Sequence, residues 1–449
     1  MQIQRALWII GIDILLFGAL FVWLPFTKEA NLGICILAFV GILWVSEAVH
    51  TTITALIVPL LAVLFELQDV TNALKTFANP VIFLFFGGFA LASALHIQGL
   101  DRLIANRLIL LAKGKMGVAI LMLFGVSALL SMWISNTATA AIMLPLALGI
   151  LSNLEISKHR GTFLFVLLGV AYSSEIGGFG TMVGSPPNII AASYLGMNFL
   201  EWMKLGIPFM CIMLPCMVGI LYLLLKPNLN QTFHLKLEKT QWDSKKIITL
   251  VIFGITALAW IFSAKLSEWF GGIKDLDSMI ALACAVAIGI TRVATWKEIQ
   301  SNTDWGVLWL FGGGLALSAI LKDSGASAVL ANGVTALFGH SNWLMIILAS
   351  ALFIIFLTEF TSNTASSALL VPIFGVVGDA LGMPHSVLPL VIGFGASCAY
   401  MLPVATPPNA IVYGTGYIKQ TEMMKYGAFV NLFSIVLILV FAWFVWRFV

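Results

Sequence analysis

Long apolar runs separated by short polar segments make up almost the whole chain. A membrane-spanning helix needs about 20 consecutive apolar residues, within a range of about 17–25. Most runs fit this length with their flanks, but those beginning at residues 118, 163, 344 and 387 are too long for one simple helix. The pattern predicts an all-α polytopic membrane protein, with about 11 transmembrane helices plus two re-entrant hairpins. The runs cover residues 6–26, 32–45, 53–67, 81–95, 118–151, 163–195, 205–225, 247–262, 280–290, 305–321, 344–377, 387–413 and 429–446.

Composition narrows the class of protein. The 449 residues are 60% hydrophobic and only 10% charged, whereas a soluble domain carries about 25% charged residues. This excludes a soluble enzyme, a nucleic-acid-binding protein and a disordered protein, so we expect membrane lipid and not nucleic acid around the chain. A transmembrane β-barrel is excluded because its short strands alternate in polarity.

The cysteines and histidines suggest no catalytic or metal centre. The five cysteines lie in apolar runs without the spacing of metal ligands, and the six histidines are scattered along the chain. Small buried side chains are the ordinary interpretation of such cysteines. No histidine lies near a candidate nucleophile in the sequence, so we expect that the protein is not an enzyme.

Lysine and arginine predict the orientation in the membrane. Sixteen of them, including Arg5, fall in one set of connections and seven in the opposite set. Because cytoplasmic loops are enriched in these residues, we expect the N-terminus and the 226–246 loop in the cytoplasm, at a bacterial inner (plasma) membrane. The first apolar run contains Asp13 and lacks a cleavage site, so residues 1–29 are interpreted as a retained first helix.

The chain contains an internal repeat. Three blocks recur in the same order, which indicates that residues 30–225 and 247–449 are two copies of one unit. Five predicted spans separate the two Ser-Asn-Thr sites, and this odd number inverts the second copy relative to the first. Inverted repeats with broken helices are typical of secondary transporters. The matched blocks are residues 131–145 (SMWISNTATAAIMLP) with 358–372 (TEFTSNTASSALLVP), 86–91 with 312–317, and 184–190 (GSPPNII) with 405–411 (ATPPNAI).

Two uncharged runs carry Ser-Asn-Thr near their middle, and they are predicted to form hairpins over 117–154 and 343–378. The turn could lie at the membrane surface or, if both arms are short, at mid-depth. Each arm has barely about 17 residues and no charge marks the tip, which favours a re-entrant hairpin. An ordinary surface turn capped by serine and asparagine is the alternative.

Double prolines interrupt two other runs, at 186–187 and 407–408. Proline removes a backbone donor and clashes with the preceding turn, so broken helices are predicted over 163–197 and 386–413. A helix break inside the hydrocarbon core of a bilayer is tolerable only where the unwound segment lines a polar cavity or contacts an ion. A kink used only for packing is the alternative, and the recurrence of Pro-Pro-Asn argues against it.

The hairpins and breaks together predict the chemistry of the site. Helix N-termini are expected after Thr137, Pro187, Thr364 and Pro408, and their partial positive charge suits carboxylates. Helix C-termini and unwound carbonyl groups suit sodium. No lysine or arginine lies in any motif, and no fixed lysine, arginine or histidine is found near the hairpin tips in the sequence, so only modest affinity for an anion is expected.

Three carboxylates are predicted at or near membrane depth. Glu359 lies beside the second hairpin tip, Glu175 precedes the first break, and Glu47 ends the second span. An ionisable group in the membrane is a functional candidate. The first-repeat counterpart of Glu359 is Met132, so its charge is not duplicated, and structural bonding and a role in ion coupling both remain open.

The paired Ser-Asn-Thr signatures and SPPN/TPPN breaks resemble the divalent anion:sodium symporter family, which includes sodium/dicarboxylate cotransporters. The resemblance covers nearly the whole chain. It implies a homodimer in which transport domains slide like elevators against fixed scaffold domains, with one sodium ion at each pair of hairpin and break. The implied scaffold covers about 1–115 and 247–340, and the implied transport domain covers about 116–225 and 341–449.

By position, the resemblance assigns ligands to two sodium ions and to the substrate. Ile134 and Thr361 occupy matching positions but differ chemically, so the two ion sites need not have equal affinity. The first sodium site would use Ser131, Ser135, Asn136 and Gly184, and the second Thr358, Thr361, Asn363 and Ala405. The substrate carboxylates would contact Asn136, Thr137, Ser185, Pro186, Asn363, Thr364, Thr406 and Pro407.

The predicted function is sodium-coupled import of C4-dicarboxylates such as succinate, malate or fumarate, with about two or more co-transported sodium ions. A sodium-independent exchanger of the same fold is one alternative, although it would be expected to carry a fixed cation near the tips. A carrier of citrate, sulfate or another oxyanion is another. An anion channel or a membrane-embedded enzyme is the remaining class.

Overall fold

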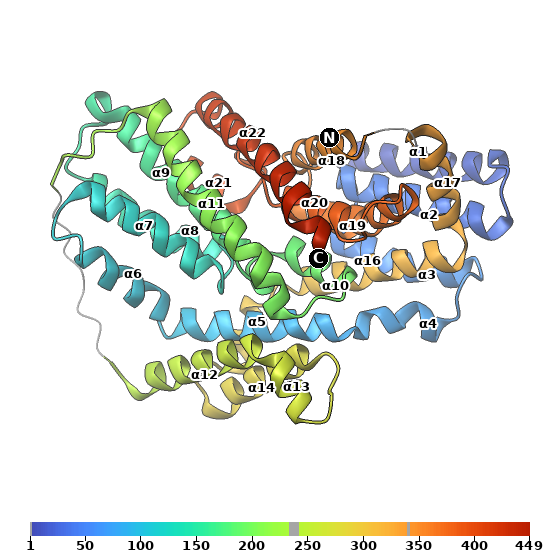
Figure 1. Ribbon diagram of the computed structural model, residues 1–449, viewed down its shortest axis with the longest axis horizontal. Coiled ribbons are helices and arrows are strands. Elements are labelled where there is room, and N and C mark those ends of the chain that lie inside the picture. The colour runs from blue at the N-terminus through green and yellow to red at the C-terminus, as the bar shows by residue number, and fades with distance from the viewer. Residues whose placement is uncertain (1, 233–241, 339–341) are drawn as a thin grey trace.

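The computed structural model describes residues 2–232, 242–338 and 342–449, and within these ranges the chain forms helices and no β-strand (Figure 1). Residues 233–241 of the predicted 226–246 loop lie outside the described residues. The α-helices are α1 (Gln2–Trp23), α2 (Lys28–Ser46), α3 (Thr51–Leu64), α4 (Val70–Lys75), α5 (Pro80–Ile97), α6 (Leu100–Leu110), α7 (Met116–Ser131), α8 (Asn136–Leu151), α9 (Ile156–Gly178), α10 (Pro186–Tyr194), α11 (Phe199–Leu225), α12 (Ser244–Ile261), α13 (Ser263–Trp269), α14 (Leu276–Thr291), α15 (Trp296–Asn302), α16 (Trp305–Asp323), α17 (Ala326–Phe338), α18 (Trp343–Thr358), α19 (Asn363–Ala380), α20 (Val387–Ala396), α21 (Pro407–Tyr413) and α22 (Gln420–Phe444).

The helices confirm the predicted all-helical membrane fold. In the described part of the chain, eight helices are long and apolar enough to cross a membrane. Others are shorter, such as α3 and α14 with 14 and 16 residues, so the number of about 11 spans stays a prediction. The most hydrophobic stretch of α1 is only 6% buried, whereas that of α9 is 94% buried. Helix α9 is therefore a central element, whereas the apolar side chains of α1 lie mostly on the surface of the molecule.

The inverted repeat is visible in how the helices pack. Helix α5 packs against α14, and its repeat counterpart α16 packs against α3. Gly87 faces Ala281 and Gly313 faces Ala55 so closely that a Cβ atom on either glycine would overlap the opposing alanine. The two contacts join matching positions of the repeats. Each repeat therefore contributes one helix to each of two close crossings.

Two helical hairpins carry the Ser-Asn-Thr motifs. In each hairpin a four-residue turn joins the arms, residues 132–135 between α7 and α8 and residues 359–362 between α18 and α19. Figure 1 shows α7 and α8 on the left of the molecule and α18 and α19 to the right of its centre. The hairpin geometry agrees with the predicted segments, and the depth of the turns in a membrane stays a prediction.

Both double prolines lie at the start of a helix. Helix α9 ends at Gly178 and α10 starts at Pro186, while α20 ends at Ala396 and α21 starts at Pro407. Proline suits the first turn because the backbone N–H groups there have no partner within the helix.

The asparagine of each Pro-Pro-Asn motif braces the unwound segment before it. The side-chain amide of Asn188 donates to the carbonyl oxygens of Gly178 and Thr181, at 2.7 and 2.8 Å. The amide of Asn409 donates to the carbonyl oxygens of Ala399 and Leu402, at 2.9 and 3.2 Å. Both asparagines are fully buried. They therefore satisfy the carbonyl groups of Gly178 and Ala399, and they add a second bond to those of Thr181 and Leu402, which also accept from a backbone N–H.

Candidate functional site

A cavity of about 520 Å³ lies where the two hairpin turns and the two helix breaks meet. Its wall combines segments that are more than 200 residues apart in the sequence, and the same four motifs that the repeat singled out form most of its polar surface. The predicted site residues that line it are Ser135, Asn136, Thr137, Gly184, Ser185, Pro186, Asn363, Thr364, Ala405, Thr406 and Pro407.

Three predicted ligands lie behind this wall. The Ser131 hydroxyl is 2.6 Å from the Asn136 side-chain oxygen, and the Thr358 hydroxyl donates to the Asn363 side-chain oxygen. The Thr361 hydroxyl is instead 2.8 Å from the Ser366 hydroxyl and 2.9 Å from the Leu357 carbonyl oxygen of the preceding helix, α18. A contribution of Thr361 to an ion site would therefore come from its backbone carbonyl.

Two helix N-termini supply donors to the cavity. Helix α8 begins at Asn136, where the Ser135 hydroxyl accepts from the amide of Ala138, and α19 begins at Asn363 with Ser362 in the matching role. The backbone N–H groups at the start of a helix have no partner within the helix and attract anions. The first two residues of α10 and α21 are prolines, which have no N–H group, so these helices shape the cavity without donating from those positions.

Oxygen atoms converge on Asn136 behind the first hairpin turn. Its side-chain amide faces the Ser131 hydroxyl at 2.6 Å and the carbonyl oxygens of Ser174 and Gly184 at 3.1 and 3.2 Å. With its NH₂ group turned this way, the amide donates to these oxygens. With its oxygen turned this way, four oxygens meet, an arrangement that suits a bound cation. A Cβ atom on Gly178 would lie 2.9 Å from this amide, so glycine leaves the room that the cluster needs.

A second oxygen cluster lies behind the other hairpin turn. The Thr358 hydroxyl is within hydrogen-bonding distance of the Asn363 side-chain oxygen, and it is 2.8 Å from the carbonyl oxygen of Ala396. Ser131 and Thr358 occupy matching positions of the repeats, as do Asn136 and Asn363. The two repeats therefore build related clusters, although their carbonyl ligands differ.

Glu359 is fully occupied by hydrogen bonds. Its carboxylate accepts from the backbone N–H groups of Met401 and Leu402, both at 2.9 Å, and from the Asn431 amide at 2.7 Å. At the matching position of the first repeat, the Met132 carbonyl accepts from a threonine hydroxyl instead. Glu359 does not line the cavity. Of the two roles left open by the sequence, these bonds favour the structural one.

Glu175 joins the two halves of the site. One of its oxygens accepts from the hydroxyl of Thr406, which belongs to the break of the other repeat. The residue is only 2% exposed, and its second oxygen has no protein partner among the described residues. Glu47, the third carboxylate, ends α2 in a left-handed conformation and does not line the cavity.

The motifs do not reveal the wall of the cavity that lies opposite them. This wall comes from α5, the end of α15 and the start of α16. It contains His96, so the expectation that no histidine lies near the hairpin tips is wrong in the folded protein. The spacing Gly88–Ala92–His96 on α5 could have found it, because residues four apart share a helix face. The missed lining residues are Phe85, Gly88, Phe89, Ala92, Ser93, His96, Asn302, Asp304 and Val307.

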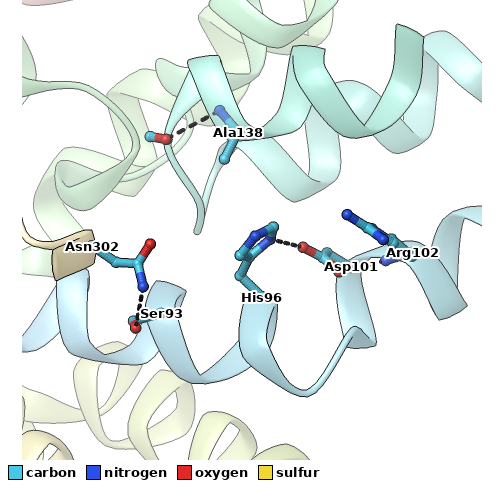
Figure 2. A network of polar contacts seen from close by, with 7 residues as sticks. Ser93, His96, Asp101, Arg102, Ala138 and Asn302 are labelled. Atoms are coloured by element: carbon cyan, nitrogen blue, oxygen red, sulfur yellow. Dashed lines mark hydrogen bonds and ion pairs between the residues drawn. The ribbon is translucent and has the colours of Figure 1, made fainter. Parts of the chain in front are cut away.

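Hydrogen bonds order the polar part of this wall (Figure 2). The Nδ1 atom of His96 is 2.8 Å from the carboxylate of Asp101, which lies on α6. The amide of Asn302 donates to the Ser93 hydroxyl at 3.3 Å. On the same side, Glu298 begins α15 with a carboxylate that accepts from the backbone N–H and the hydroxyl of Thr295, and these bonds lower the pKa of that carboxyl.

Comparisons with known proteins agree with this architecture. The profile of the citrate transporter family matches residues 41–384 and 276–449. An uncharacterized transporter of Haemophilus influenzae is 55% identical over 97% of this chain and 96% of its own length. A sodium-dependent dicarboxylate transporter of Staphylococcus saprophyticus is 32% identical over 92% of this chain and 86% of its own length.

The fold has a relative among solved structures. The YdaH transporter of Alcanivorax borkumensis aligns with a TM-score of 0.58 and 15% identity, over 84% of this chain and 88% of that one, which is a likeness of fold alone. The family profile and the dicarboxylate transporter each match most of the sequence. The chain belongs to the citrate transporter family, and with it to the divalent anion:sodium symporter group that its motifs resemble.

Proposed function

We propose that the protein is a secondary active transporter that uses sodium to import C4-dicarboxylates such as succinate, malate or fumarate. The observation that carries this proposal is the convergence of both hairpin turns and both helix breaks on one cavity. Each repeat contributes one helix N-terminus with free donors and one cluster of oxygen atoms. Two sets of donors suit the two carboxylates of a dianion, and two oxygen clusters suit two sodium ions.

The two sodium ions would occupy the oxygen clusters behind the hairpin turns. The first would be held by Ser131, Ser135, Asn136 and Gly184, and the second by Thr358, Thr361, Asn363 and Ala405, partly through carbonyl groups. Each cation lies close to the helix start that would bind a carboxylate, so ion and substrate stabilise each other. The sodium-dependent dicarboxylate transporters of Staphylococcus that match this chain support the coupling.

The substrate would lie between Asn136, Thr137, Asn363 and Thr364, with Ser185, Pro186, Thr406 and Pro407 around it. Citrate is the second candidate, because the matching family is that of citrate transporters and His96 adds a further polar group to the cavity. A sodium-independent exchanger is less well supported. His96 lies on the opposite wall and cannot replace a cation inside either oxygen cluster.

An asymmetry between the repeats supports an elevator mechanism. Gly88 and Gly314 occupy matching positions, as do Val183 and Val404. Val183 packs on Gly88, where an added Cβ atom would lie 2.9 Å from the valine. Val404 is 83% exposed, and Gly314 faces an alanine of α19 instead. We propose that the transport domain, about 116–225 and 341–449, slides on the scaffold until Val404 reaches Gly314.

The same symmetry supports two vestibules. A polar pocket of about 850 Å³ is lined by Thr76, Ala78 and Ala319. These residues match Asn302, Asp304 and Ser93, which line the cavity that holds the hairpin turns. Asn302 of α15 lines the cavity and His96 is bonded to Asp101 of α6, and the positive charges assign these two helices to the cytoplasmic side. We therefore propose an inward-facing state, in a homodimer with a cytoplasmic N-terminus at the inner membrane.

Transport by the reconstituted protein tests the proposal. Labelled succinate uptake is measured in liposomes with an inward sodium gradient, with an inward potassium gradient, and with unlabelled succinate inside. Uptake driven by the sodium gradient alone is the expected result. Uptake that is independent of sodium and requires internal dicarboxylate would establish the exchanger. Stronger competition by citrate than by malate would make citrate the proposed substrate.

A further inference from the structure

His96 lies on the wall of the cavity that faces the hairpin turns. It comes from the last turn of α5, and Figure 2 shows it directed toward Asp101, below the start of α8 that carries Ala138. Its side chain is 40% exposed, whereas the side chain of Asp101 is fully buried. The imidazole is therefore accessible from the cavity, and the acid behind it is not.

Asp101 fixes the orientation of the ring. One oxygen of its carboxylate is 2.8 Å from Nδ1 of His96, and the other accepts from the backbone N–H of Arg102 at 2.6 Å. A carboxylate that holds Nδ1–H in this way determines the tautomer and leaves Nε2 as the remaining polar atom of the ring. No protein group in the described residues is hydrogen-bonded to Nε2.

We propose that His96, positioned by Asp101, donates a hydrogen bond from Nε2 to a carboxylate of the substrate when the cavity is open on the side of α5. This proposal rests on the proposed function, because it assumes a dicarboxylate between the hairpin turns. It adds a cationic donor to a site whose motifs contain none. It also makes that donor part of the scaffold and not of the moving domain.

A contact on the scaffold acts on one face of the membrane only. If the hairpin turns move away from α5 during transport, the substrate leaves His96 behind. The matching position of the second repeat is Lys322, an exposed residue in the last turn of α16. Helices α5 and α16 thus each carry a basic side chain in their last turn, but Lys322 does not line the cavity that holds the hairpin turns.

Nε2 donates only when the ring carries its second proton, because Nδ1–H is already bonded to Asp101. The charged groups near the ring are Asp101 and Arg102 on α6 and Asp304 at the start of α16, and the carboxylate of Glu298 on α15 is bonded to its own helix start. A dianion beside Nε2 favours the protonated ring. The contact is therefore expected to strengthen as the pH falls through the range in which histidine titrates, about pH 8 to 6.

Measurements on oriented membrane vesicles test this contact. The KM for succinate is determined at each face, with right-side-out and inside-out vesicles, at about pH 6 and about pH 8. His96→Ala is expected to raise the cytoplasmic KM roughly tenfold at the lower pH, the usual size of a lost charge-assisted hydrogen bond, and to change the outer KM far less. His96→Gln keeps a donor and should restore part of the affinity while abolishing the pH dependence.

Lys322→Ala is the matched control, and it should leave the cytoplasmic KM unchanged. An equal increase of KM at both faces in His96→Ala, or a pH dependence that survives in His96→Gln, would overturn the proposal. A wild-type protein without sodium-driven succinate uptake would instead refute the proposed function. In that event the contact is read from the thermal stabilisation of the detergent-solubilised protein by succinate, which His96→Ala must weaken if the inference is right.

Discussion

Replacing Asn409 by leucine should open the second helix break. Leucine has the same branching as asparagine, with two methyl groups in place of the amide oxygen and nitrogen, so the change removes the amide without leaving a cavity. Two carbonyl oxygens, those of Ala399 and Leu402, lose the donor that lies 2.9 and 3.2 Å away. Both partners are buried in the interior of a membrane protein, where water does not replace the lost bonds.

The expected cost follows from these two bonds. The Leu402 carbonyl keeps a second bond, from the backbone N–H of Ala405 at 3.2 Å, so only the Ala399 carbonyl is left without a partner. A buried acceptor without a partner costs about 1–3 kcal/mol, and the native conformation of the break loses about that much. The lower value reduces the population of this conformation about 5-fold and the upper value about 100-fold, because each 1.4 kcal/mol corresponds to about a factor of ten. We expect Asn409→Leu to abolish succinate transport and to lower the melting temperature in detergent.

A control variant and the equivalent variant in the first repeat make the test specific. Asn153→Leu changes an exposed asparagine between α8 and α9 and should have little effect on either measurement. Asn188→Leu removes the equivalent pair of bonds at 2.7 and 2.8 Å and should be at least as severe. Transport and melting temperature of Asn409→Leu equal to those of the control would refute the reasoning that this amide holds the break.

Three further predictions concern the mechanism. The pair Gly314→Cys and Val404→Cys should form a disulfide under oxidising conditions during turnover and block transport until reduced, and failure to cross-link in an active transporter would contradict the sliding motion. Gly178→Ala should raise the sodium concentration needed for half-maximal transport several-fold, because the added Cβ atom would lie 2.9 Å from the Asn136 amide of the first oxygen cluster. Gly219→Ala is the control, because nothing lies within 4 Å of a Cβ atom there. Glu175→Gln should keep the hydrogen bond from Thr406 of the second break and retain the affinity for substrate, whereas Glu175→Leu should raise the KM about tenfold. Equal KM values in the two variants would count against a role for this bond.

Local motifs explain why much of the site could be predicted from the sequence. Asn136 and Asn363 begin helices and Pro186 and Pro407 interrupt runs, because capping residues and prolines act on the backbone within a few positions. The repeat then indicated that these local features belong to one site, and their place in a common cavity agrees with that expectation.

The rest of the site depends on tertiary packing, which the motifs do not encode. His96 is distant from the motifs along the chain, and it comes close to them only because α5 forms the facing wall of the cavity. The bond between Glu175 and Thr406 likewise joins two repeats, and no spacing in either repeat predicts it. The number of spans likewise depends on packing, because α3 and α14 are shorter than a simple span and pack against α16 and α5.

The crossings of α5 with α14 and of α16 with α3 have a consequence for biosynthesis. Gly87 is made early, but its partner Ala281 emerges from the ribosome almost 200 residues later. The first repeat must therefore wait in the membrane with one helix face uncovered until the second repeat arrives. Neither repeat can complete its packing alone. A chain truncated between the repeats is therefore expected to be degraded by cellular quality control as an incompletely folded protein.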